Sequence, residues 1–152
     1  MPTVLDVILS KGDTVHSIGP TESVIDAVHK MNQFKIGCLM VMQGDQVMGI
    51  FTERDVLTRV VGARRDPART VLADVMTPEP EALTSGHRVA YALHCMSVAG
   101  YRTVPLVDDE ARVIGVITAT DIVTWLASLF PEEILNLPPG GRIKHPEKID
   151  AG

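Results

Sequence analysis

Aromatic residues are scarce in this chain of 152 residues: they make up 4% of the sequence, although hydrophobic residues make up 45%. The apolar side chains are therefore mainly Val, Ile, Leu, Met and Ala. No uninterrupted apolar stretch approaches the ~18 residues that a membrane helix needs, so we expect no membrane span. Basic residues are outnumbered, and the net charge of −5 argues against binding to nucleic acid or to anionic membranes.

Cysteine is rare as well. The two cysteines, Cys38 and Cys95, have no CxxC partner, and we interpret them as small core residues in a reducing compartment. Residues 1–6 lack the basic region of a secretory signal, so we expect a cytoplasmic protein. The mean hydropathy of +0.17 is high for a soluble domain and predicts an apolar interface with another subunit.

One pattern occurs twice in the chain. The segment at 49–57 returns at 115–123 with Gly, Thr, Asp and every apolar position kept. Two further pairs of segments match: 24–31 with 89–96, and the lead-ins 3–7 with 70–75. A repeat of this length predicts two copies of one supersecondary unit.

Each copy has the pattern of a strand, a helix, two strands and a second helix. In the first copy, apolar periodicity and turn signals predict these elements at 14–18, 24–31, 38–42, 47–51 and 53–61. In the second copy they are expected at 81–84, 88–99, 103–107, 113–117 and 119–130. Strands that are apolar throughout must be covered on both faces. We therefore predict an α/β (α+β) fold whose two units pack sheet to sheet with pseudo-two-fold symmetry.

Each unit closes on Gly-hydrophobic-hydrophobic-Thr-x-x-Asp, at 49–55 and 115–121. Together with Val-Met-Thr-Pro at 75–78 and the run at 100–109, this pattern resembles the CBS domain (cystathionine beta-synthase domain). The pair resembles the tandem known as a Bateman module, and the resemblance covers residues 3–130. Outside these residues there is no room for an enzyme or transporter domain, which favours the stand-alone bacterial type.

This resemblance divides the chain into three parts. The first CBS unit with its lead-in is expected at 1–66, and the second with its lead-in at 67–130. A C-terminal extension follows at 131–152, which either packs along a partner subunit or stays mobile.

The resemblance implies that the cleft between the copies binds an adenosine-containing molecule, AMP, ADP or ATP, with S-adenosylmethionine or NAD as alternatives. It implies that Asp55 and Asp121 accept the ribose hydroxyls, a task that suits a carboxylate. Thr52 and Thr118 stand at helix starts, where free backbone N–H groups favour a phosphate. The adenine edge would meet the main chain of two strand starts: Gly37, Cys38 and Leu39, and Thr103, Val104 and Pro105. No further cofactor is required.

The Thr-x-x-Asp pattern is also a capping box, in which both side chains satisfy backbone N–H groups at the helix start. Asp55 has a further structural use, because Arg59 follows at i+4 on the same helix face. Asp121 has Trp125 at that position. These structural roles are compatible with ligand binding, and the sequence leaves both open.

The copies differ where phosphate contacts are expected. Arg54 of the first copy is replaced by Thr120 in the second, and Arg102 has no arginine counterpart at 35–38. We hypothesise that the two sites are inequivalent and that both arginines make charge-assisted contacts to nucleotide phosphates. The alternative is that both are solvated.

No nucleophile, base and orienting residue form a catalytic grouping, so we expect no enzyme. His29 and His94 are equivalent but have no ligand set around them, so we expect no metal site. The leading interpretation is a regulatory module that binds a nucleotide and forms a homodimer. The alternative is a ligand-free scaffold that regulates a partner enzyme or transporter through its dimer surface.

Overall fold

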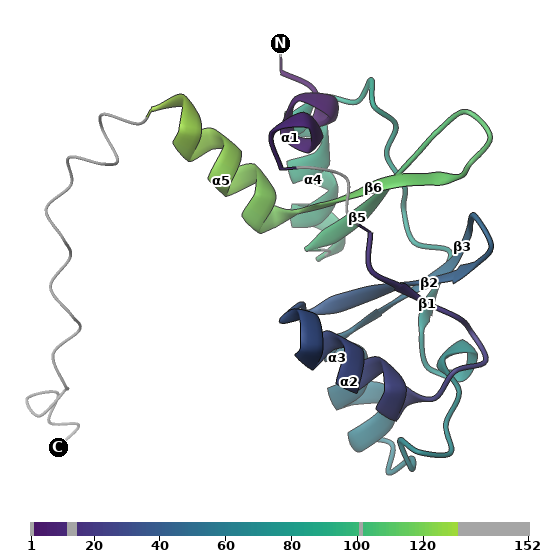
Figure 1. Ribbon diagram of the computed structural model, residues 1–152. Coiled ribbons are helices and arrows are strands. Elements are labelled where there is room, and N and C mark those ends of the chain that lie inside the picture. The colour runs from purple at the N-terminus through teal and green to yellow at the C-terminus, as the bar shows by residue number, and fades with distance from the viewer. Residues whose placement is uncertain (1, 12–14, 101, 131–152) are drawn as a thin grey trace, which may run out of the picture.

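The computed structural model of the chain describes residues 2–11, 15–100 and 102–130. Two sheets lie against each other in the middle of the molecule, and helices lie on their outer sides (Figure 1). The first unit contains β1 (Ser17–Ile18), α2 (Val24–Phe34), β2 (Cys38–Gln43), β3 (Gln46–Thr52), α3 (Glu53–Asp55) and η1 (Val56–Val61). The second contains α4 (Val89–Ala99), β5 (Thr103–Val107), β6 (Val113–Thr118) and α5 (Ala119–Leu129). The lead-ins contain α1 (Val4–Lys11), η2 (Leu72–Asp74) and β4 (Thr77–Pro78).

The first sheet has the strand order β1-β2-β3-β4, in which β1 is parallel to β2 and the other neighbours are antiparallel. In the second sheet β5 is antiparallel to β6. The strand predicted at 81–84 is shorter than expected, since it is reduced to one bridge between Leu83 and Leu106. The Leu83 N–H donates to the Pro105 carbonyl, and the Leu83 carbonyl accepts from the Val107 N–H. Leu83 is therefore the residue of this segment that pairs with β5.

Four helices begin with the same device, a Ser or Thr followed three residues later by Asp. The pairs are Thr3 and Asp6, Ser23 and Asp26, Thr52 and Asp55, and Thr118 and Asp121. In each pair a side-chain oxygen accepts a backbone N–H at the helix start, where the helix itself provides no partner. The capping boxes predicted at 52–55 and 118–121 are confirmed, because both halves of each box are present.

The helix predicted at 53–61 forms, but it changes type after its first turn. Asp55 is followed by the wider π-helical turns of η1, which end at Gly62. The Gly62 N–H donates to the Leu57 carbonyl at 2.8 Å. A Cβ at Gly62 would lie 2.9 Å from that carbonyl oxygen, so a glycine suits this helix end. The corresponding helix of the second unit, α5, is α-helical throughout.

The lead-in segments exchange places between the units. α1 precedes the first unit along the chain, yet it packs against β6 and α5 of the second (Figure 1). Its buried side chains Val4, Val7 and Ile8 belong to the core of the second unit. Conversely, Leu72 and Val75 of the second lead-in belong to the core of the first. The division of the sequence after residue 66 stays a prediction, but each spatial core includes a segment from the other side of it.

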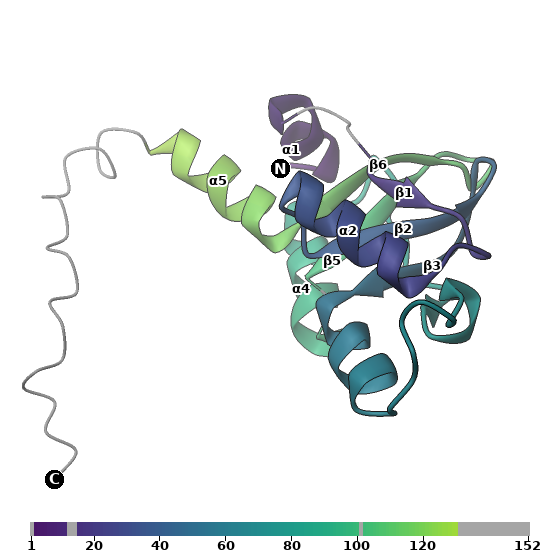
Figure 2. The same cartoon turned by 60° about the horizontal axis from the view of Figure 1, so that its bottom comes forward.

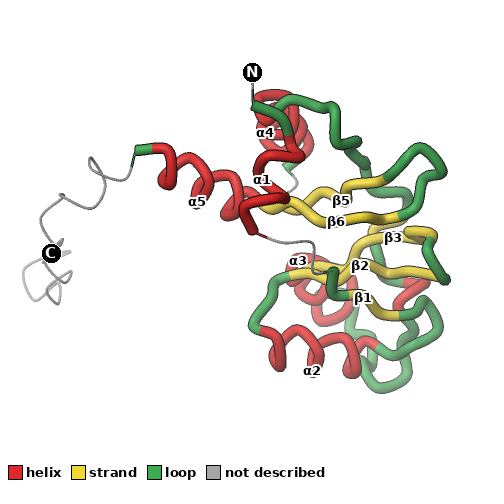
Figure 3. The backbone as a smooth tube through the Cα atoms, turned by 45° about the horizontal axis from the view of Figure 1, so that its top comes forward, coloured by secondary structure: helices red, strands yellow, loops and turns green. Residues whose placement is uncertain are grey.

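Equivalent positions of the two copies meet where the sheets pack face to face (Figure 3). The Cys38 thiol donates to Thr103 Oγ1 at 3.4 Å, and these residues open β2 and β5. Ile50 and Val116, which are equivalent in the repeat, share one buried apolar cluster. Contacts between equivalent positions are what a two-fold axis produces. The predicted sheet-to-sheet packing with pseudo-two-fold symmetry is confirmed.

The two hairpins also touch at their ends. Gln46 of β3 forms an antiparallel bridge with Arg112, and the Val113 N–H donates to the Asp45 carbonyl at 3.3 Å. Figure 2 shows the connections β2–β3 and β5–β6 side by side. The sheet interface is therefore joined at the strand starts and again at the hairpin ends.

Cys38 and Cys95 are not joined in a disulfide; they are half-buried and buried, in agreement with their interpretation as small core residues. Across residues 2–11, 15–100 and 102–130, no helix has both the length and the apolar character needed to cross a membrane. The C-terminal extension predicted at 131–152 lies outside the described residues.

Candidate functional site

Four of the predicted site residues lie in one row across the junction of the units. Thr52 pairs with Cys38 in the first sheet, and Thr118 pairs with Thr103 in the second. The hydrogen bond of 3.4 Å between Cys38 and Thr103 joins the two halves of the row. The structure therefore brings both Thr-x-x-Asp motifs to the same edge of the paired sheets, although they lie far apart in the sequence.

Gly37 and Arg102 flank this row at equivalent positions. The Gly37 carbonyl accepts the Glu53 N–H at 3.1 Å, and the Arg102 carbonyl accepts the Ala119 N–H at 2.9 Å. The carboxyl carbon of Glu53 lies 3.5 Å from where a Cβ at Gly37 would stand, so a carboxylate covers this strand start in the first copy. In the second copy an arginine and an alanine take these two places. At these two places a negative side chain in the first copy is thus replaced by a positive one in the second.

The other strand residues predicted to line the site, Leu39, Val104 and Pro105, are buried. The Leu39 side chain belongs to the first core and the Val104 side chain to the second. Their main chains pair within the sheets, and the Pro105 carbonyl accepts the Leu83 N–H at 2.9 Å. The first residues of each predicted segment keep exposed surface: Gly37, Cys38 and Thr103.

Asp121 and Thr118 form the cap of α5. The Thr118 N–H donates to Asp121 Oδ2 at 2.8 Å, and the Asp121 N–H donates to Thr118 Oγ1 at 3.0 Å. Asp121 is half-buried, and Trp125 packs against the second core. The capping role is confirmed, and the ligand role stays a prediction.

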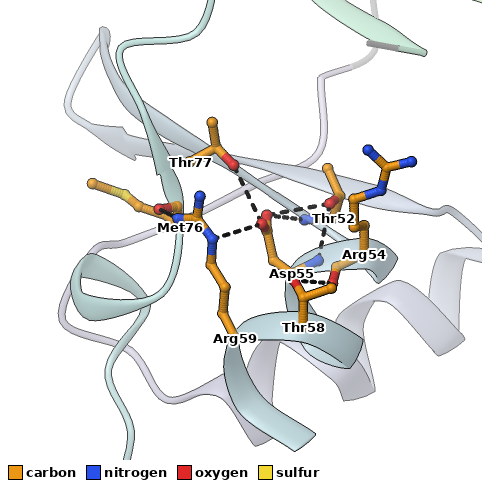
Figure 4. A network of polar contacts seen from close by, with 7 residues as sticks. All are labelled: Thr52, Arg54, Asp55, Thr58, Arg59, Met76 and Thr77. Carbon is orange, nitrogen blue, oxygen red and sulfur yellow. Dashed lines mark hydrogen bonds and ion pairs between the residues drawn. The ribbon is translucent and has the colours of Figure 1, made fainter. Parts of the chain in front are cut away.

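Asp55 is more deeply buried, with 4% of its surface exposed, and lies at the centre of a polar network (Figure 4). Oδ2 accepts the N–H and the hydroxyl of Thr52, at 3.0 and 3.2 Å. Oδ1 accepts the Thr77 hydroxyl at 3.2 Å and faces Arg59 Nε at 3.5 Å. Arg59 also donates from Nη1 to the Met76 carbonyl at 2.7 Å. The predicted pair of Asp55 and Arg59 is confirmed, and the network connects this helix to the lead-in of the second copy.

Arg54 and Arg102 are both exposed. Within the described part of the chain, neither guanidinium forms a hydrogen bond or an ion pair. Figure 4 shows the Arg54 guanidinium pointing away from Asp55, and Arg54 joins the network through its carbonyl, which accepts the Thr58 hydroxyl at 2.8 Å. The phosphate contacts expected of both arginines stay a prediction.

Two features of the site were missed by the sequence analysis: the Thr77 hydroxyl on Asp55 and the Glu53 carboxylate over Gly37. The Val-Met-Thr-Pro signal marks the segment that contains Thr77. Nothing local indicates that this hydroxyl meets a carboxylate 22 residues earlier. Of the residues that can be placed, no three His, Cys, Asp or Glu side chains are grouped so that they could hold a metal ion.

The family profile of the CBS domain matches this chain twice, at residues 8–62 and 72–128. The chain belongs to the CBS-domain family. This CBS pair is 31% identical over 144 residues to the CBS domain-containing protein CBSX3, mitochondrial, of Arabidopsis thaliana, which covers 89% of this chain and 69% of that protein. The crystal structure of the CBS-domain containing protein ATU1752 from Agrobacterium tumefaciens is 28% identical, with a TM-score of 0.75 over 80% of this chain and 97% of that one.

Other relatives are longer or more distant. The CBS pair is 33% identical over 113 residues to CBSCBSPB1 of Arabidopsis thaliana, but it spans only 21% of that protein. Two more distant CBS structures contain adenosine compounds. The CBS domain pair of MJ0100 was solved with 5′-methylthioadenosine and S-adenosyl-L-methionine, at 21% identity and a TM-score of 0.68 over 82% of this chain and 98% of that one. CBSX2 was solved with AMP, at 23% identity and a TM-score of 0.69 over 87% and 99%. At these identities the likeness establishes the fold alone.

Proposed function

We propose that this chain is a non-enzymatic regulatory module that binds an adenosine-containing nucleotide at the junction of its two CBS units. The observation that carries the proposal is the row of Thr52, Cys38, Thr103 and Thr118, which sets both Thr-x-x-Asp motifs on one edge of the paired sheets. The complexes of CBSX2 with AMP and of MJ0100 with S-adenosyl-L-methionine support it, because adenosine compounds are bound there to the same fold.

Each part of such a ligand has a matching group in this chain. A carboxylate can accept both hydroxyls of a ribose, which assigns Asp55 and Asp121 to the ribose. Thr118 stands at the N-terminus of α5, and Thr52 has the same place before α3. The positive end of a helix dipole favours a phosphate at such places. The exposed strand starts beside them offer main-chain groups to adenine.

Arg54 and Arg102 supply positive charge for the phosphates of AMP, ADP or ATP. A guanidinium binds phosphate through two parallel N–H donors, and both side chains are exposed. Thr120 replaces Arg54 in the second copy, and Gly37 stands in the place of Arg102 in the first. We therefore expect two unequal sites. S-adenosylmethionine has no phosphate and would gain nothing from either arginine.

Thermal unfolding with AMP, ADP, ATP, NAD and S-adenosylmethionine tests the proposal. A ligand that binds only the folded state adds about 2.7 kcal/mol at 100 times its Kd. We expect an adenine nucleotide to raise Tm. If none of the five raises Tm at such an excess, the nucleotide proposal is refuted. The scaffold alternative, in which the CBS pair regulates a partner enzyme or transporter, then takes its place.

Isothermal titration calorimetry with ATP tests the two arginines. Arg54→Ala and Arg102→Ala should each weaken binding by about tenfold, the effect of losing one charge-assisted contact. Arg69→Ala is the control, because it removes one positive charge from a linker side chain that is 88% exposed. Unchanged affinity in both test variants would show that these arginines are only solvated.

A homodimer forms the second part of the proposal. Leu57 and Val123, which are equivalent in the two copies, are 66% and 63% exposed, and Leu129 and Phe130 near the end of α5 are more than half exposed. Apolar side chains of this size favour burial against a second subunit. We expect sedimentation at micromolar concentration to give a dimer, and the double variant Leu57→Glu, Val123→Glu to give a monomer. A monomer in the unchanged chain would contradict the proposal.

A further inference from the structure

Each acceptor position of the Asp55 carboxylate already faces a donor, three in hydrogen bonds and one in an ion pair. A carboxylate offers about four lone-pair positions, two on each oxygen. Oδ2 accepts the N–H and the hydroxyl of Thr52, while Oδ1 accepts the Thr77 hydroxyl and faces the Nε of Arg59. A ribose hydroxyl can therefore reach Asp55 only by displacing one of these donors.

Arg59 is the donor that leaves most easily. The contacts with Thr52 belong to the cap of α3, and their loss would open the helix start. The Arg59 side chain is 46% exposed, so water can solvate its guanidinium after it leaves Asp55. Although Asp55 is buried, the distance of 3.5 Å between Arg59 Nε and Oδ1 is the longest of the four contacts and exceeds that of an ordinary N–H···O hydrogen bond, and a ribose hydroxyl would replace it on the carboxylate. Its displacement by a ligand therefore costs little.

Arg59 also holds the segment that leads into the second copy. Its Nη1 donates to the Met76 carbonyl at 2.7 Å, and Thr77 begins β4, which pairs with β3. Figure 4 shows the guanidinium between Asp55 and Met76. In the second copy Trp125 takes the place of Arg59 and packs against the core. The first copy thus has a link between the predicted ribose acceptor and the strand that joins the units.

We propose that Arg59 is a positioning residue that competes with the ribose for Asp55, and that a nucleotide bound there releases Met76 and Thr77 from the first unit. This inference rests on the proposed function, because it takes Asp55 as a ribose acceptor. Without nucleotide, Arg59 and Thr77 occupy Oδ1. Once ribose hydroxyls occupy it, Arg59 loses the carboxylate that holds its guanidinium beside Met76, and Thr77 of β4 loses its hydrogen bond to α3. Occupancy of the first copy is thereby transmitted to the segment that continues into the second.

Hydrogen exchange without nucleotide tests the part of this inference that needs no ligand. Arg59→Ala should speed amide exchange at residues 76–79 by at least about threefold, because the segment loses one charged hydrogen bond. Arg69→Ala is the matched control, since it removes an exposed Arg–Asp pair of the same kind, and it should leave exchange there unchanged. If exchange at residues 76–79 is equal in the Arg59→Ala variant and the unchanged chain, Arg59 does not stabilise this segment and that part of the inference is refuted.

Titration with AMP tests the competition. The background is Asp121→Asn, which alters the second predicted ribose acceptor and leaves Asp55 in place. In this background Arg59→Ala should bind AMP about three- to tenfold more tightly, because the competing contact is gone. Thr77→Val, which removes the other donor to Oδ1, should act in the same direction. Equal or weaker binding after Arg59→Ala overturns the competition.

A third measurement tests the release. Saturating AMP should speed exchange at residues 76–79 of the unchanged chain, and slower exchange there would overturn the release. If the unchanged chain binds AMP but Arg59→Ala alters neither affinity nor exchange, this inference fails and the proposed function stands. If none of the proteins binds an adenine nucleotide, the proposed function fails and the competition with it. The ligand-free exchange still decides whether Arg59 holds this segment.

Discussion

Gly49 and Gly115 occupy the same place in the two copies but face different neighbours. A Cβ at Gly49 would lie 2.6 Å from the Met76 sulfur and 2.7 Å from the Thr77 carbonyl oxygen. A Cβ at Gly115 would lie 3.4 Å from Cδ1 of Ile8. The first position is closed by backbone, which cannot turn aside, whereas the second faces the end of a side chain.

Gly49→Ala should therefore lower the free energy of unfolding by about 1–3 kcal/mol, the usual cost of overpacking. Gly115→Ala is the matched variant and should cost less than about 1 kcal/mol, because its neighbour can move by a few tenths of an ångström. Urea denaturation of both variants measures the difference. Equal losses would mean that β4 moves away from β3 at little cost.

Asp108 stabilises the turn between β5 and β6. Its Oδ1 accepts the N–H of Arg112 at 2.9 Å and the N–H of Glu110 at 3.0 Å, and its Oδ2 accepts Arg112 Nε at 2.9 Å. These bonds to the charged form, the one from the Arg112 N–H first among them, hold the pKa of Asp108 below its ordinary value. The turn therefore depends on an ionised carboxylate.

Because the pKa of Asp108 is lower in the folded state, its stabilisation is present above the unfolded-state pKa of ~3.9 and is lost as the pH falls through the folded-state pKa. Asp108→Asn should lower Tm at neutral pH, and the difference from the unchanged chain should shrink as the pH falls well below ~3.9. Asp109→Asn at the exposed neighbouring position is the control. A difference in Tm that does not vary with pH would contradict this role.

At the scale of elements, α2 offers a test of capping outside the proposed site. The Ser23 hydroxyl accepts the Asp26 N–H at 3.2 Å. Ser23→Ala should lower the free energy of unfolding by about 1 kcal/mol, and Ser23→Asn should restore most of it because it keeps a capping oxygen. Chemical denaturation measures both variants. Equal stability of the two would mean that the hydroxyl contributes nothing to the helix start.

The helix at 53–61 shows which features of a single element can be predicted from the sequence and which cannot. Its start at Glu53 and its end at Gly62 follow from two signals that act within one helical turn, a capping pattern and a glycine, although Gly62 has right-handed backbone angles (φ −62°) and not the left-handed ones of the usual glycine cap. Its π-helical turns at 56–61 do not. In an α-helix each N–H donates to the carbonyl four residues earlier, and in a π-helix to the carbonyl five residues earlier. The sequence patterns of the two are nearly the same, so the surrounding packing decides between them.

At the scale of the whole molecule, each core contains a lead-in from the other copy, and mutations should act across the chain. Leu72 and Val4 are fully buried, in the first and the second core respectively. Leu72→Ala should cost about 2–5 kcal/mol and speed hydrogen exchange mainly in β2 and β3. Val4→Ala should speed exchange mainly in β5 and β6. If each change instead acted on the unit nearest in the sequence, the exchange of lead-ins would be wrong.

The sequence by itself determined the repeat, the order of elements, the caps at Thr52 and Thr118 and the pair of Asp55 with Arg59. These features depend on apolar periodicity or on residues within one helical turn, so a linear pattern contains them. It also determined the family, because the pattern recurs in order along most of the chain. Thr52, Asp55, Thr118 and Asp121 were predicted as site residues for the same reason, as parts of a repeated motif, and their ligand role stays a prediction.

Only the tertiary structure decided which distant residues meet. The Thr77 hydroxyl reaches Asp55 across 22 residues because β4 pairs with β3, and Cys38 meets Thr103 across 65 residues because the two sheets stack. The exchange of the lead-ins and the burial of Leu39 and Val104 follow from the same packing. Strand pairing and sheet stacking are settled by the burial of apolar surface over the whole molecule, which no local pattern contains.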